Sequence, residues 1–69
     1  MTQNDMILRY LRDEGSITPL DALREFGCMR LGARIWDLKH RGHEIIRTME
    51  SKQNRYGKRV SYARYRLEE

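Results

Sequence analysis

Apolar residues recur at helical spacing in three stretches of the chain, which cover about residues 3–14, 19–26 and 30–41. The first two stretches follow a threonine that can cap a helix N-terminus, and a glycine closes each of the three. We therefore predict three amphipathic helices. The residues expected on their buried faces are Ile7, Tyr10 and Leu11 in the first helix, Leu20, Leu23 and Phe26 in the second, and Leu31, Ile35 and Leu38 in the third.

The period of the pattern changes after Gly42, where β-branched residues begin to alternate with polar ones. Residues 43–49 and 58–67 are predicted to form two strands, and the polar segment 50–57 is predicted to be the loop between them. Together they make a β-hairpin over about residues 43–67.

The second of these strands carries apolar residues on both of its faces. Ala63 and Leu67 share one face with Tyr65, whereas Val60 and Tyr62 fall on the other. This change of face predicts a bulge or a strong twist near the middle of the strand.

The order of the predicted elements is helix, strand stub at residues 16–17, helix, tight turn, helix and hairpin. Two helices joined by about three residues form a helix-turn-helix unit, and a basic hairpin directly after it makes the unit a winged one. Ile35 and Leu38 lie about two positions later than the buried positions of a plain helix-turn-helix, which favours the winged variant. The predicted fold class is α+β, with three helices and a C-terminal β-hairpin wing in one domain over residues 1–69.

Length and composition narrow the range of functions. A chain of 69 residues has a thin core and cannot enclose the deep cleft of a typical enzyme. No Ser/His/Asp arrangement, glycine-rich phosphate loop or metal motif is present, so we expect no catalytic residue, no metal and no cofactor. Cys28 is the single cysteine, which fits a reducing cytoplasm. No stretch has the apolar length of a membrane span, so no membrane partner is expected.

The net charge of +4 is unevenly distributed. Acidic residues outnumber basic ones over residues 1–29, whereas residues 30–66 are strongly basic, mostly through arginine. Arginine binds phosphate with two parallel hydrogen bonds and can recognise the edge of guanine. The uneven distribution therefore favours nucleic-acid binding by the second half of the chain.

Several segments resemble a family of small winged helix-turn-helix proteins found in bacteriophages and prophages. The most specific part of the resemblance is the block Ala33–Leu38, followed by the glycine at position 42. The segments Thr18–Gly27, Arg30–Lys39, Arg41–Ile45 and Tyr62–Leu67 are similar as well, so the resemblance covers most of residues 5–67. It implies a winged helix-turn-helix fold, a cytoplasmic location in a bacterial or phage-infected cell, and DNA binding.

The third helix and the hairpin supply the candidate DNA contacts. The residues proposed for the helix are Met29, Arg30, Ala33, Arg34, Asp37, His40 and Arg41, and those for the wing are Lys52, Asn54, Arg55, Lys58 and Arg59. Arg30 is the best candidate for reading a guanine edge. Arg34 could bind phosphate or pair with Asp37, and the sequence leaves both open. Trp36 either is covered by the first helix or the wing, or it is exposed and contacts a partner protein or the DNA backbone.

The leading hypothesis is a double-stranded DNA-binding protein that regulates phage or prophage transcription or assists excision, replication or packaging. The alternative is a protein-interaction module that binds or inhibits a host or phage protein through helix three and the wing. A third hypothesis is binding of single-stranded DNA or RNA, with Trp36, Tyr56 and Tyr62 stacking on bases. One short readout helix gives limited specificity, so a homodimer or adjacent binding sites are further possibilities.

Overall fold

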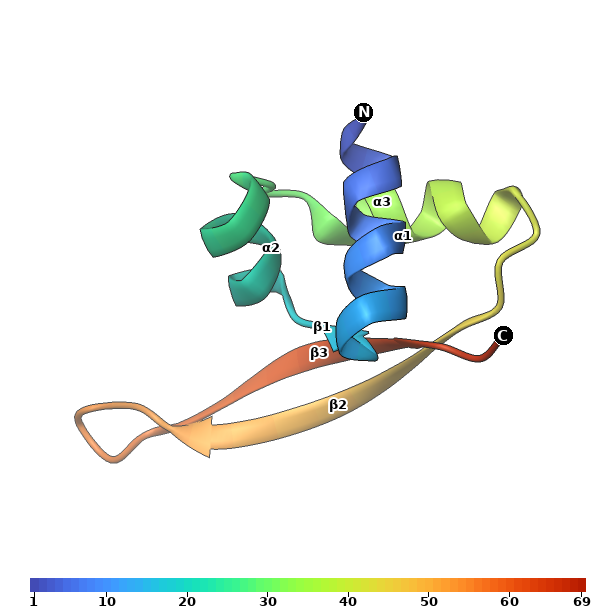
Figure 1. Ribbon diagram of the computed structural model, residues 1–69. Coiled ribbons are helices and arrows are strands. Elements are labelled where there is room, and N and C mark those ends of the chain that lie inside the picture. The colour runs from blue at the N-terminus through green and yellow to red at the C-terminus, as the bar shows by residue number, and fades with distance from the viewer.

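The computed structural model describes residues 1–69 and contains three helices and three strands. Their bounds are α1 Gln3–Glu14, β1 Ser16–Ile17, α2 Pro19–Phe26, α3 Leu31–His40, β2 Ile45–Gln53 and β3 Arg59–Leu67. The helices lie on one side of the sheet, with α3 crossing behind α1, and the turn of the β2–β3 hairpin extends beyond α2 (Figure 1). Three helices followed by a β-hairpin in an α+β arrangement agree with the architecture predicted from the sequence.

The first two helices begin at reciprocal caps. The hydroxyl oxygen of Thr2 accepts a hydrogen bond from the backbone N–H of Asp5, and the Asp5 carboxylate accepts one from the backbone N–H of Thr2. Thr18 and Asp21 repeat this arrangement at the start of α2, with distances of 3.0 and 3.2 Å. Because each capping box satisfies backbone N–H groups that the first turn leaves free, both helices begin at the residues that the sequence indicated.

The sheet has the order β1-β3-β2, and both of its strand pairs are antiparallel. The strand stub is part of this sheet, because Ile17 pairs with Tyr65 of β3. Pairing of β2 with β3 continues without interruption from Ile45 opposite Leu67 to Gln53 opposite Arg59. Of the bulge or strong twist expected in the return strand, the bulge is therefore absent.

The first hairpin strand is also longer than predicted. Residues 50–53, expected in the loop, belong to β2, and the turn is confined to residues 54–58. The turn extends beyond the helices (Figure 1), whereas residues 50–53 form the mostly exposed outer part of β2. Backbone pairing to β3 rather than burial holds it, so an alternating apolar pattern is not required there.

One small core joins all the elements except the outer hairpin. It consists of Ile7, Leu11, Ile17, Ala22, Cys28, Leu31, Ile35, Leu38 and Ile45. Phe26 and Tyr10 pack against its edge with their rings perpendicular and their centroids 5.6 Å apart. The stripes predicted for the first and third helices are confirmed, since Ile7, Leu11 and Leu38 are almost fully buried.

The predicted inner face of the second helix is wrong for two of its three residues. Leu20 and Leu23 are 55% and 47% exposed, whereas Phe26 packs against the edge of the core as expected and Ala22 is the fully buried residue of α2. Packing against the core through an alanine lets this short helix approach closely, and it turns its two leucines toward the hairpin side. Apolar spacing alone could not distinguish these two orientations.

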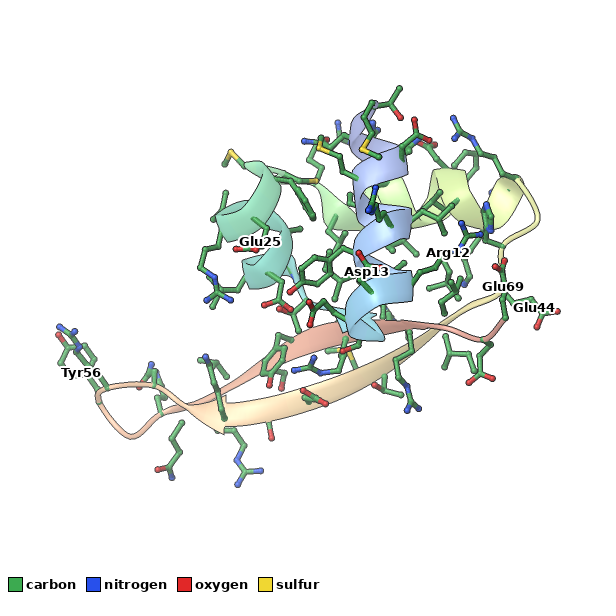
Figure 2. The ribbon with its side chains drawn as sticks, in the orientation of Figure 1. Arg12, Asp13, Glu25, Glu44, Tyr56 and Glu69 are labelled. Carbon is green, nitrogen blue, oxygen red and sulfur yellow. The ribbon has the colours of Figure 1, made fainter.

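The end of the chain is attached to α1 and to the loop before β2. The backbone N–H of Glu68 donates to the carbonyl of Glu44, and Nδ1 of His43 lies 2.7 Å from the Glu69 carboxylate. Arg12 of α1 reaches the same carboxylate at 3.5 Å (Figure 2). The hydrogen bond from His43, more than the arginine, lowers the pKa of Glu69.

None of the three helices has the length and apolar character needed to cross a bilayer.

Candidate nucleic-acid interface

Helix α3 is positioned by a tight turn that follows α2. Gly27 adopts φ 64°, and its backbone N–H donates to the carbonyl of Leu23, which ends α2. This left-handed conformation favours glycine and redirects the chain within a few residues. The buried side of α3 then packs against α1 through Leu31, Ile35 and Leu38.

The outer side of α3 carries an exposed aromatic pair. Trp36 is 60% exposed, and its ring is stacked on that of His40, with centroids 3.7 Å apart and an angle of 26°. Nδ1 of His40 also lies 2.9 Å from the backbone carbonyl of Trp36, which fixes the imidazole in place. Neither α1 nor the wing covers Trp36, so of the two alternatives raised by the sequence the exposed one is correct.

Arg34 and Asp37 form an internal pair on the flank of α3. Their charged groups are 3.4 Å apart, and the Asp37 carboxylate also accepts a hydrogen bond at 3.4 Å from the side chain of Asn4. Asn4 is buried, and sequence reasoning missed it because one asparagine in an amphipathic helix carries no distinguishing signal. Asp37 therefore links α3 to α1. Direct DNA contact by Arg34 or Asp37 stays a prediction.

The remaining candidates on this side are exposed, with the exception of Ala33. Arg30 precedes α3 as its N-cap residue, and Met29 lies beside it in the turn. Arg41 follows the helix, whereas Ala33 is half-buried. Arg30 and Arg41 have no carboxylate within 4 Å, so both guanidinium groups are free to bind an external anion.

The wing ends in a turn that its asparagine stabilises. The side-chain oxygen of Asn54 accepts hydrogen bonds from the backbone N–H groups of Tyr56 and Lys58, each at 3.0 Å. Gly57 supplies the positive φ of 77° that this turn requires. Asn54 thus stabilises the conformation of the turn. Tyr56, which is 86% exposed, lies at the tip of the wing (Figure 2).

Cationic side chains surround this turn. Lys52, Arg55, Lys58 and Arg59 are all exposed, and none of them has an acidic partner within 4 Å. Lys52 lies 5.8 Å from the ring centre of Tyr62, and Arg59 donates to the hydroxyl of Ser51. These neighbours are neutral, so the wing keeps its full positive charge.

The comparison with protein families covers nearly the whole molecule. Residues 2–69 match the family of winged helix-turn-helix domains. The chain belongs to this family. No curated protein and no solved structure shows a significant match to the chain. Winged helix-turn-helix domains are DNA-binding modules. In this domain a helix follows the tight turn and a two-stranded wing follows that helix. This is the order of elements in which such modules present the helix and the wing to DNA.

Within this winged helix domain, Arg64 has a structural role that the sequence did not indicate. Its guanidinium donates to Glu50 at 2.9 Å and to the hydroxyl of Ser16 at 2.9 Å. The contact joins all three strands. The Arg64 hydrogen bond is the main cause of the lowered pKa of Glu50, and the same bond raises the pKa of Arg64.

This ion pair predicts a pH-dependent stability. Because the folded pKa of Glu50 lies below its ordinary value, the pair stabilises the fold above about pH 4.5, and the stabilisation is lost as the pH falls through the lower folded value. Glu50→Gln should therefore lower the melting temperature at pH 7 and make no difference at a pH well below the folded value. Glu44→Gln removes an exposed acid without an ion pair and serves as the control at pH 7. An equal loss for Glu50→Gln at all pH values would contradict the role of the pair.

A groove lies between α2 and the wing. It has a volume of about 580 Å³, and its apolar lining includes Leu20 and Leu23 of α2, Met29, and Val60 and Tyr62 of β3. The face change along β3 thus has a simple cause, since Val60 and Tyr62 face this groove while Leu67 packs against the core. Cys28 is buried beside the groove, and no group of three or more His, Cys, Asp or Glu side chains could hold a metal ion.

Proposed function

We propose that this winged helix-turn-helix domain binds double-stranded DNA, with α3 in the major groove and the wing along the phosphate backbone or in the adjacent minor groove. The single observation that carries the proposal is the distribution of free cations. In the acidic first part of the chain, Arg9, Arg12 and Arg24 each have a carboxylate within 4 Å. Every Lys or Arg without such a partner lies from residue 30 onward: Arg30, Lys39, Arg41, Arg47, Lys52, Arg55, Lys58, Arg59 and Arg66.

Free arginines at both ends of a helix that begins after a tight turn, and on a projecting hairpin, are suited to a polyanion of regular shape. Phosphate contacts from the wing would set the position of the domain, and the start of α3 would contact base edges. We extend the proposal to a transcriptional regulator, or an accessory factor for excision, replication or packaging, in the cytoplasm of a bacterial or phage-infected cell. One readout helix of ten residues supports high specificity best as a homodimer or on adjacent sites.

A mobility-shift series tests the proposal. Genomic duplex fragments are bound by the protein at two salt concentrations and then challenged with unlabelled duplex or with either single strand of the same sequence. We expect duplex to displace the labelled fragment, single strands to displace it weakly, and complexes to weaken at the higher salt concentration. Equal competition by single strands would favour stacking on the exposed Trp36 and Tyr56 instead.

A protein partner is the second candidate function. The observation that favours it is the exposed apolar surface of the domain, which includes Trp36 and the leucines of the α2–wing groove. Such a partner would bind the exposed face of α3 and the wing, and its own surface would be acidic. Under this hypothesis, Arg30→Ala and Trp36→Ala would weaken the same protein complex, and neither would alter binding to duplex DNA.

A further inference from the structure

The outermost line of α3 is apolar, although its surroundings are basic. Within α3, Ala33, Trp36 and His40 follow one another at intervals of three and four residues, opposite the buried stripe of the helix, and Met29 precedes them in the turn before the helix. We call Ala33 and Trp36, together with Met29 of the turn, the apolar stripe. Met29 is 85% exposed and Trp36 is 60% exposed, so solvent covers two large apolar side chains at the centre of the proposed recognition surface.

The stripe offers few hydrogen-bonding groups to a base edge. No carboxylate or guanidinium lies on it, and Nδ1 of the adjacent His40 is already within 2.9 Å of a backbone carbonyl. Charged groups flank the stripe on both sides. Arg34, paired with Asp37, and the free Arg41 lie on one side, and the exposed, unpaired Lys39 lies on the other. In the major groove, the base feature that an apolar side chain contacts favourably is the C5-methyl group of thymine.

The geometry of the stripe suits such a contact. The stack on His40 holds the indole of Trp36 in one orientation, so little side-chain freedom is lost when the indole meets a methyl group. Ala33, one turn before it, is small and half-buried, and it allows the helix to approach the base edges closely.

We propose that the apolar stripe reads thymine methyl groups in the major groove, and that Trp36 is the specificity-determining residue for at least one T·A pair. The inference rests on the duplex-binding function proposed above and adds to it the chemistry that is recognised. The free guanidinium groups of Arg30 and Arg41 lie near the stripe and favour DNA over a protein as its binding partner. The reason is that an exposed apolar line bordered by unpaired arginines matches the major groove, where thymine methyl groups lie between two phosphate backbones.

The test uses a duplex selected from a random pool by the wild-type chain. Each thymine of the selected site is replaced in turn by deoxyuridine, which keeps the base pair and removes the methyl group. We expect one or two replacements to weaken binding by about three- to tenfold, the effect of losing one buried methyl group. Changing such a T·A pair to C·G should weaken binding too, and 5-methylcytosine at that position should restore part of the loss.

Two variants connect the methyl effect to the stripe. Trp36→Ala should bind the thymine and deoxyuridine duplexes equally, with unchanged circular dichroism. Met49→Ala is the matched control, because Met49 is equally exposed, at 59%, but lies on β2 away from α3. It should keep the full difference between the two duplexes.

The possible results distinguish failure of this inference from failure of the proposed DNA-binding function. If the wild-type chain binds a selected duplex but is insensitive to deoxyuridine at every position, the inference is overturned and DNA binding stands. If Trp36→Ala retains the methyl effect, or leaves affinity for every duplex unchanged, Trp36 does not read the methyl group and an interface with a protein is indicated. If no duplex can be selected, the proposed function itself has failed.

Discussion

Leu38→Ala is expected to destabilise the domain by about 2–5 kcal/mol. Leu38 is 1% exposed and packs in the single core where α3 meets α1. Truncation removes buried apolar surface and leaves a cavity that the short helices cannot easily close. Since a domain of this size has only a few kcal/mol of stability, the variant should be largely unfolded near 37 °C. Thermal and urea unfolding followed by circular dichroism measure the loss.

Leu23→Ala is the matched control for this change. The same side chain is removed, but Leu23 is 47% exposed at the edge of the α2–wing groove. Its loss should cost less than about 1 kcal/mol, because half of its surface is already in water. The spacing of apolar residues alone would assign the two leucines equal importance. Equal destabilisation would show that α2 packs with its leucines inward, contrary to the structure.

Arg30→Ala is expected to lower affinity for the selected duplex by about 10- to 100-fold, while non-specific binding falls much less. Arg30 is exposed at the start of α3 and has no ion pair. A guanidinium at this position can donate two hydrogen bonds to O6 and N7 of a guanine, which is a sequence-dependent contact. The fold should be unaffected, since Arg30 caps α3 without a side-chain hydrogen bond.

Arg9→Ala controls for the loss of one positive charge. Arg9 lies on α1, is largely exposed, and pairs only with Asp13 one turn later. A surface pair of this kind contributes little to stability, so the variant should fold and bind as the wild type does. The control is expected to keep full discrimination between the selected site and random duplex. If Arg30→Ala kept full discrimination as well, Arg30 would not be a base-reading residue.

The sequence was sufficient to predict the helices and the overall fold because the signals are local. Thr18, Pro19 and Asp21 mark the start of α2, and Gly27 marks its end, whatever surrounds them. The winged arrangement followed from the order of elements and from the short connection before α3. The orientation of α2 did not follow, because Leu20 and Leu23 satisfy helical spacing equally well whether they face a core or a groove.

The parts of the site that escaped prediction depend on contacts between distant segments. Arg64 bonds to Ser16 and Glu50, and Asn4 bonds to Asp37, over separations that no local pattern encodes. Sequence reasoning therefore identified neither of these contacts. The free cations of the wing were easier to identify, because a polar hairpin that projects from the body has few acidic neighbours to pair with.

The salt dependence of duplex affinity tests the central claim most directly. The free cations of the wing and of the α3 flank allow about six phosphate contacts, so the slope of log affinity against log salt concentration should be roughly −5. Lys58→Ala and Arg59→Ala should each make the slope shallower by about 1 and weaken binding similarly on all sequences. A slope shallower than about −2 with tight binding retained, or a slope that neither variant changes, would contradict duplex binding through this surface.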